Sequence, residues 1–306
     1  MNPVETNPIR VRNRVVYQLT PGRIVAWVLL AVLIFITLFP LWIVIKTAIT
    51  HPKELFEQAT LLFPSDPTLL NFRRALGMVS LEENLAVGGV ANINFLTAMR
   101  NSVLFTLTIV VSQTFFSAMA AYAFARLRFP GRDLIFFLFL AATMIPGAVL
   151  FIPNFILVKN LGWLNTFQGM VAPFVLMTPF AVFFLRQFFL AVPKELEEAA
   201  YLDGASPFYV FWRIILPISK TPLVTLAILT TINTWNEFFW PWIVSKDNNM
   251  QVLTVALKMF QSQTPQGSPD WTGLMAATFL AIIPVFILLV VLGRQVVESL
   301  QFSGLK

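Results

Sequence analysis

One uncharged stretch near the N-terminus, IVAWVLLAVLIFITLFPLWIVI, runs from Ile24 to Ile45 and decides the fold class. A helix needs roughly 20 apolar residues to cross a hydrocarbon core about 30 Å thick, and this stretch is long enough. A cleaved signal peptide has a shorter apolar core followed by a small-residue cleavage site, so the stretch is typical of a retained anchor. The sequence therefore predicts a transmembrane helix over residues 24–45.

The composition agrees with a protein embedded in a lipid bilayer. Of 306 residues, 57% are hydrophobic and only 12% are charged, against about 25% charged in soluble domains. The chain has no cysteine and a single histidine, His51, which excludes disulfides, cysteine nucleophiles and imidazole clusters for a metal. We therefore expect neither a catalytic site nor a metal site. The basic residues lie beside apolar segments instead of forming a basic domain, so we do not expect nucleic-acid binding either.

Five further apolar runs are long enough to span a bilayer. They are Asn101 to Ala125, Leu134 to Val158, Met170 to Phe184 extended toward Leu190, Pro222 to Val244, and Gly273 to Gly293. The third span contains Pro146, Gly147 and Pro153, which predict a kinked or broken helix. We therefore expect an all-α membrane protein with six transmembrane helices.

The orientation follows from the distribution of basic residues in short loops, because cytoplasmic loops are enriched in lysine and arginine. Basic residues precede the first span and fill the connection between the second and third spans: Arg10, Arg12, Arg14, Arg23, Arg126, Arg128 and Arg132. The connection after the third span has only Lys159. Both termini are therefore expected in the cytoplasm.

This topology divides the chain into five parts. Residues 1–23 and 294–306 form cytoplasmic tails, and residues 24–45 form the first helix. Residues 46–100 form an extracytoplasmic segment with short helical pieces such as Pro52 to Ala59, either a binding surface or a passive cap. Residues 101–293 form a core of five transmembrane helices that includes an inner loop over residues 191–221.

The inner loop has the residues of a helical hairpin. Pro193 suits the first turn of a short helix that ends at Gly204, a residue that adopts the left-handed conformation easily. Ser206 and Pro207 then supply an N-cap and a first-turn proline for a second helix, which Pro217 closes. Phe208, Phe211, Trp212 and Ile215 give that helix an apolar face. These features fit either a surface anchor or a contact with a partner.

The spacing of Glu198-Ala199-Ala200, Gly204, Ile214 and Leu216-Pro217 resembles the Glu-Ala-Ala signature of permease subunits in ATP-binding-cassette importers. From about Phe95 onward the chain is similar to the maltose-type carbohydrate permeases. The segments that carry this similarity are Ala120 to Arg126, Phe129 to Arg132, Met144 to Pro146, Leu161-Gly162, Phe183 to Phe189, Trp235 to Phe238, and Trp240-Pro241.

The resemblance implies that the inner loop is a coupling hairpin that binds a separate ATPase subunit. The residues assigned to coupling are Glu198, Ala199, Ala200, Asp203, Gly204, Ala205, Ser206, Pro207, Ile214, Leu216 and Pro217. The chain has no phosphate-binding loop, because Lys46-Thr47 and Lys220-Thr221 lack the preceding glycine. ATP and magnesium are therefore expected in the partner ATPase, and this chain is not itself an enzyme. Glu198 serves either to pair with a partner or to stabilise its own helix.

Four residues are candidates for the translocation path. Pro146 and Gly147 break the third span, which either exposes polar backbone to a cavity or only improves packing. Asn236 and Glu237 interrupt the fifth apolar run, where an acid costs free energy unless it is solvated or paired. The nearby Trp235, Trp240 and Trp242 suit an interfacial belt or stacking on sugar rings.

The resulting prediction is a multi-pass permease subunit of the prokaryotic inner membrane that moves a di- or oligosaccharide. Its expected partners are a second, nonidentical permease, two copies of a cytoplasmic ATPase and an extracytoplasmic solute-binding protein. A secondary transporter of a small polar solute is the alternative, although it usually has inverted repeats and several ionisable residues in its spans. An intramembrane hydrolase would need a nucleophile with a base, and no such set is visible.

Overall fold

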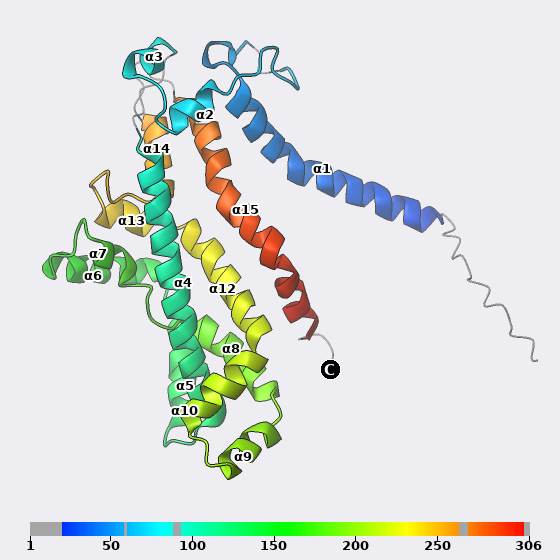
Figure 1. Cartoon of the computed structure of the whole chain (residues 1–306), viewed down its shortest axis with the longest axis vertical. Helices are drawn as coiled ribbons and strands as arrows, with labels where there is room; N and C mark the ends of the chain where they lie inside the picture. The colour runs from blue at the N-terminus through cyan, green and yellow to red at the C-terminus, as the bar shows by residue number, and fades with distance from the viewer. Residues whose placement is uncertain (1–19, 58–59, 88–92, 263–268, 303–306) are drawn as a thin grey trace, which may run out of the picture. The chain divides into compact units, whose positions relative to one another are not determined.

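The computed structural model describes residues 20–57, 60–87, 93–262 and 269–302, and every regular element within these ranges is a helix (Figure 1). The chain forms two compact units, residues 1–43 and 44–306, each of which is described by itself. Most of the expected N-terminal tail and the last four residues of the C-terminal tail lie outside the described residues. The predicted all-α class is confirmed for the part of the chain that the structure describes.

The first predicted span is a single helix, α1 (Pro21–Ile49). It contains no acidic residue and continues through Pro40. Its side chains from residue 21 to residue 41 are exposed, and nearly all of them are apolar. A helix that is apolar all round requires an apolar environment, which a bilayer provides.

The segment after α1 contains three short helices: η1 (Pro52–Glu54), α2 (Leu70–Ala75) and α3 (Leu81–Ala86). The helix expected over residues 52–59 is therefore shorter than predicted and ends at Glu54. Residues 55–57 form turns, and residues 58 and 59 lie outside the described residues. Phe56 is exposed, so the segment has no buried face to extend a short helix that is marginal on its own.

A buried polar network orders this segment. The Arg74 guanidinium on α2 donates to Asn84 on α3 and forms an ion pair with Asp270. Asn71 on α2 donates to the backbone carbonyl of Thr50 at 2.7 Å. These contacts join residues far apart in the sequence and give the segment a defined structure.

Four helices form the centre of the larger unit: α4 (Phe95–Arg126), α8 (Pro179–Ala191), α12 (Lys220–Trp235) and α15 (Trp271–Phe302). Helix α4 packs against both α8 and α12, and α12 packs against α15. Small residues such as Ala121, which is completely buried, let the backbones approach closely. The second and sixth predicted spans are confirmed as continuous helices.

The third predicted span is broken. It consists of α5 (Arg132–Ala141), the 3-10 turn η2 (Ala142–Met144) and α6 (Gly147–Asn160), and its two parts meet at 95°. The break falls at Pro146, in agreement with the prediction, because the residue before a proline avoids the helical conformation. Pro153, in contrast, lies inside α6.

The fourth predicted span is not one helix, which corrects the sequence-based boundaries. A short helix α7 (Phe167–Val171) is followed by residues 172–178 without regular helix, and α8 begins only at Pro179. Thr178 has an extended backbone, as expected for a residue before proline, and its hydroxyl accepts a hydrogen bond from the Ala181 amide. These local contacts explain why an uninterrupted apolar run contains a break.

The fifth predicted span is also interrupted. Helix α12 ends at Trp235, and a separate short helix α13 (Phe239–Val244) follows. The Glu237 carboxylate accepts a hydrogen bond of 3.1 Å from the Trp240 amide, which satisfies a donor in the first turn of α13. Helix α14 (Leu253–Ser262) then leads toward α15.

By length and composition, three described helices can each cross a bilayer, namely α1, α4 and α15. The number rises to five if each bent helix pair counts as one span: α5–η2 with α6, and residues 207–218 with α12. The multi-pass character is therefore supported, whereas the count of six spans and the positions of the termini stay predictions.

Candidate functional site

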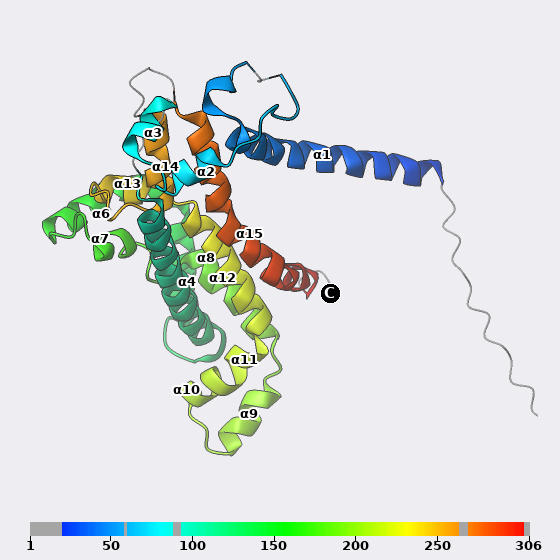
Figure 2. The ribbon, with the colours of Figure 1, turned by 45° about the horizontal axis from the view of Figure 1, so that its top comes forward.

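The segment between α8 and α12 folds as two short helical parts joined by a turn (Figure 2). The first part is α9 (Glu195–Leu202), with Lys194 at its N-cap. Pro193 precedes the cap and is not in the first turn as predicted, because Val192 and Pro193 continue the extended link from α8. The first turn carries three acids, Glu195, Glu197 and Glu198, at the positive end of the helix.

The turn after α9 is a Schellman motif. Gly204 has φ of +83°, so the predicted left-handed conformation is present. Its amide donates to the Tyr201 carbonyl at 3.0 Å, and the next amide, of Ala205, donates to the Ala200 carbonyl at 2.9 Å. Both bonds satisfy carbonyls that the end of the helix would leave without a partner.

The second helical part has three segments: α10 (Pro207–Val210), the π-helical turn η3 (Phe211–Ile215) and α11 (Leu216–Ile218). The Ser206 hydroxyl accepts a hydrogen bond from the Tyr209 amide at 3.2 Å, which confirms the predicted N-cap. We call residues 194–218 the hairpin.

Pro217 does not close the second helix as predicted, because the helical conformation continues to Ile218. The Leu216 amide donates to the Phe211 carbonyl, five residues earlier, which defines the π-helical turn. A proline has no amide hydrogen, and the wider turn just before it shifts the hydrogen-bond register. The chain then bends by 78° into α12.

The residues assigned to coupling divide between two faces of the hairpin. The exposed ones are Glu198, Ala199, Asp203, Gly204, Ser206, Pro207 and Pro217. The others are partly buried against a cluster formed by α4, α8 and η3: Ala200, Ala205, Ile214 and Leu216. The structure thus brings the predicted set together on one element, with an attached side and a free side.

The free side of the hairpin has large apolar side chains. Leu202, at the turn, is 89% exposed, and Phe208 on the second helix is 63% exposed. Leu196 and Tyr209 are also exposed, and Trp212 is exposed although its ring centroid lies 6.0 Å from that of Phe115 on α4. Several large exposed apolar side chains on one short element are typical of a surface that a partner covers.

The attached side is held by Arg126, which the sequence indicates only as part of a basic loop and of a segment similar to the importer permeases. Arg126, the last residue of α4, lies with its Nε 2.7 Å from Glu197 Oε1, and both side chains are less than a tenth exposed. Its Nη2 also donates to the backbone carbonyl of Phe189 at 2.7 Å. Burial raises the pKa of the Glu197 carboxyl above its usual value, and Arg126 opposes this shift. Because 70 residues separate Arg126 from Glu197 in the sequence, no local pattern indicates that the two form a pair.

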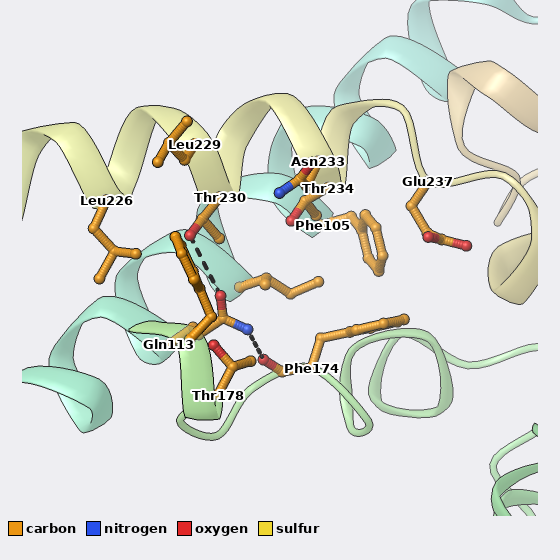
Figure 3. Close-up of a pocket in the computed structure, with 12 residues that line it drawn as sticks. Phe105, Gln113, Phe174, Thr178, Leu226, Leu229, Thr230, Asn233, Thr234 and Glu237 are labelled. Atoms are coloured by element: carbon orange, nitrogen blue, oxygen red, sulfur yellow. Dashed lines mark hydrogen bonds between the residues drawn. The ribbon is translucent and has the colours of Figure 1, made fainter. Parts of the chain in front are cut away.

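A cavity lies between α4, α8, α12 and the residues before α8 (Figure 3). Its volume is about 420 Å³, and its walls are largely apolar with a few polar groups. The polar lining residues are Gln113, Thr178, Thr230, Asn233, Thr234 and Glu237. A mainly apolar cavity with a small number of polar groups is the usual form of a binding site for a small molecule.

One glutamine crosses this cavity and joins three of its walls. Gln113, in the middle of α4, donates from Nε2 to the Phe174 carbonyl at 3.2 Å (Figure 3). Its Oε1 accepts a hydrogen bond from the Thr230 hydroxyl of α12 at 3.3 Å. The amide is thus satisfied, whereas Asn233 is exposed on the cavity wall.

The four residues predicted for the translocation path lie in different places. Glu237 lines the cavity of Figure 3. Asn236 lines a smaller pocket between α12, α14 and α15, and its amide donates to the Ile232 carbonyl at 2.7 Å. Pro146 and Gly147 are exposed at the bend between α5 and α6. The structure does not bring these four side chains together.

The three tryptophans of this region also have distinct surroundings. The indole N–H of Trp235 donates to the Ala281 carbonyl, and that of Trp240 donates to the Gly169 carbonyl. Trp242 has the Lys258 ammonium 3.9 Å from its ring centroid and that of Lys246 at 4.8 Å. The first two tryptophans thus make hydrogen bonds to the backbone, and the third makes cation–π interactions.

Comparison with known proteins identifies the family. Residues 113–301 match the family described as "Binding-protein-dependent transport system inner membrane component". The arabinooligosaccharides transport system permease protein AraQ of Halalkalibacterium halodurans is 35% identical over 92% of this chain and 97% of its own length. The sn-glycerol-3-phosphate transport system permease protein UgpE of Salmonella typhi is 32% identical over 88% of this chain and 92% of its own.

The fold is also that of a known transporter subunit. A chain in the crystal structure of a bacterial ABC transporter involved in the import of the acidic polysaccharide alginate superposes with a TM-score of 0.77 and 24% identity. The match covers 90% of this chain and 98% of that chain. Together, these findings establish that the chain belongs to the family of inner membrane components of binding-protein-dependent transport systems and is a permease subunit of an importer.

Proposed function

We propose that this permease subunit translocates a di- or oligosaccharide and that its hairpin binds a separate ATPase subunit. The observation that carries the proposal is the free side of the hairpin. Leu202 and Phe208 are largely exposed on a loop that also carries the acids Glu198 and Asp203. Burying such side chains against a partner removes apolar area from water, which stabilises the complex. The full signature of the importer permeases lies on the same element.

The assembly that we propose contains a second, nonidentical permease, two copies of a cytoplasmic ATPase that bind ATP and magnesium, and an extracytoplasmic solute-binding protein. The membership of the family supports this composition. It also favours six transmembrane helices with both termini in the cytoplasm. The sugar assignment is supported by the name of the arabinooligosaccharide relative and by the acidic polysaccharide that the structurally similar transporter imports.

The cavity of Figure 3 is our candidate for this subunit's part of the sugar path. Asn233 and Glu237 offer hydrogen-bond donors and acceptors for hydroxyl groups, and Phe105 and Phe180 supply apolar walls. Helix α12 ends at Trp235, which places Glu237 in the break before α13 and on the wall of the cavity. Breaks of this kind are where transporters hold polar solutes.

The ATPase contact is tested by a matched pair of leucines. Leu202→Ser removes an exposed apolar side chain from the hairpin, and Leu81→Ser makes the same change at an exposed position of α3. In the purified complex, we expect Leu202→Ser to reduce the amount of co-purified ATPase at least about fivefold, because one buried leucine contributes about 2 kcal/mol to an interface. Leu81→Ser should have no effect. Equal amounts of ATPase in both variants would contradict the proposal.

The path is tested by two asparagines on different cavities. Asn233→Ala removes a polar group from the cavity of Figure 3, and Asn236→Ala removes one from the neighbouring pocket. We expect Asn233→Ala to raise the sugar concentration needed for half-maximal uptake by about fivefold, the loss of one hydrogen bond. If only Asn236→Ala changes uptake, the sugar path runs through the pocket that Asn236 lines.

A further inference from the structure

The C-terminal end of α4 contacts both the hairpin and α8 through a single side chain. Arg126 Nη2 donates to the carbonyls of Phe189 and Val192 at the end of α8, and Nε forms the ion pair with Glu197 of α9. The two carbonyls belong to the negative end of a helix, which attracts a cation. One guanidinium therefore joins three elements that the sequence separates.

The two helical parts of the hairpin are attached in different ways. In α9, all of which the structure describes, Glu197 is the only buried residue. In the second part, Val210, Phe211 and Ile215 are buried within the apolar cluster that includes α4 and α8. The second part is thus held by buried apolar residues, whereas the buried contact of α9 is charged and its apolar contact, through Ala200, is only partly buried.

Tyr122, one turn before Arg126 on α4, adds a second contact to α9. Its hydroxyl lies 3.3 Å from the hydroxyl of Tyr201, and its ring centroid lies 5.3 Å from that of Phe211. Tyr122 itself is buried. The contacts of Arg126 with Glu197 and of Tyr122 with Tyr201 start from the same face of α4. A movement of α9 against α4 must therefore break or strain both.

Helix α4 continues from this end to the other side of the unit without interruption. Its middle carries Gln113, which crosses the cavity, and its start carries Asn101 and Ser102. Asn101 donates to the carbonyls of Asn249 and Gln251, and the Ser102 hydroxyl accepts from the Leu253 amide. A single rigid helix thus connects α9, the cavity and the segment before α14.

We propose that Arg126 is a positioning residue for coupling: it holds α9 through Glu197 so that a displacement of the hairpin moves α4 and, with it, the cavity wall. The inference rests on the proposed binding of the hairpin to an ATPase. It assigns a role to two residues outside the Glu-Ala-Ala signature. The ion pair is the transmitting contact, and the apolar second part of the hairpin keeps its place when the pair is lost.

The test uses the assembled complex in proteoliposomes, with ATP hydrolysis and sugar uptake measured on the same samples. Glu197→Gln keeps the size of the side chain and removes its charge, so the shape of α9 is preserved. Glu195→Gln, an exposed acid of the same helix, is the matched control. Arg126→Lys keeps a positive charge but loses the fork of donors that reaches α8 and α9 together.

We expect Glu197→Gln and Arg126→Lys each to lower the number of sugars moved per ATP at least about tenfold, with normal amounts of ATPase in the complex. Glu195→Gln should behave like the unmodified protein. The double variant Arg126→Lys with Glu197→Gln should be no worse than the more affected single variant, because both changes break one contact.

Two results separate the possible failures. If Glu197→Gln keeps the normal ratio of uptake to hydrolysis, the positioning role of Arg126 is wrong. This holds even if Leu202→Ser reduces the amount of co-purified ATPase. If the ratio is normal for Glu197→Gln and Leu202→Ser also retains the ATPase, the proposed function of the hairpin is wrong as well. A variant that only lowers the yield, with a normal ratio per complex, assigns the pair a purely structural role and overturns the inference.

Discussion

Two buried pairs of an arginine and an acid lie at opposite ends of the larger unit, and their surroundings differ. The outer ion pair joins Arg74 on α2 to Asp270 before α15. Its guanidinium also donates to Asn84, Asn71 and Thr272. The Asp270 carboxylate accepts further bonds from the Gly273 amide and the Thr272 hydroxyl, which cap α15. Nearly every donor and acceptor of this pair is used.

The inner ion pair joins Arg126 to Glu197 and is less completely satisfied. Arg126 Nη2 binds two carbonyls, but Nε, Nη1 and Glu197 Oε1 make no hydrogen bond of good geometry within the described residues. Nε and Oε1 are close enough for an ion pair all the same. A saturated buried network fixes one arrangement, whereas an unsaturated one costs free energy to keep buried.

The difference indicates two roles for the same chemistry. The outer pair fastens α2, α3 and the start of α15 into one fixed cap. The inner pair holds α9, a helix with no fully buried apolar residue, and in our proposal a partner displaces this helix. The predictions below change one end at a time.

The largest effect is expected at the outer pair. Arg74→Ala leaves Asp270 buried without its counter-charge, which costs about 3 to 5 kcal/mol, a large part of the stability of a typical domain. We expect little folded protein and a sharply lower midpoint in thermal unfolding of the detergent-solubilised complex. Arg73→Ala changes the exposed neighbour on the same helix and should be neutral. A normal midpoint for Arg74→Ala would mean that the cap does not depend on this network.

A smaller effect is expected at the turn of the hairpin. A valine at Gly204 is strained at φ of +83°, by about 1 to 3 kcal/mol, although no atom lies within 4 Å of the new Cβ. We expect normal membrane insertion, reduced binding of the ATPase and loss of sugar uptake. Gly162→Val is the matched control, because Gly162 has φ of +71° and equally open surroundings between α6 and α7. Normal uptake by both variants at the expression of the unmodified protein would show that the hairpin is only a surface anchor.

The sequence predicted the long helices and the hairpin because each rests on local signals. Apolar length determined α1, α4 and α15, and Gly204 with Ser206 determined the turn. The breaks before α8 and α13 were missed, since the caps that stabilise them, Thr178 and Glu237, lie inside runs that read as one span.

The partners of the buried charges were missed for a different reason. Arg74 meets Asp270, and Arg126 meets Glu197, only after distant helices pack together. In the sequence, Arg126 belongs to the basic residues that predict a cytoplasmic loop, and Glu197 stands next to Glu198 of the signature. A single sequence does not indicate which of two neighbouring acids on a short helix is buried.

The comparison is tested most directly by neutralising the acid of each pair and measuring sugars transported per ATP in the same reconstituted complex. Glu197→Gln should lower this ratio at least about tenfold, with a smaller fall of the unfolding midpoint than in Asp270→Asn, because Arg126 keeps its bonds to the Phe189 and Val192 carbonyls. Asp270→Asn should lower the midpoint while each surviving complex keeps the normal ratio. A normal ratio in Glu197→Gln, or a ratio that falls equally in both variants, would contradict the assignment of coupling to the inner pair.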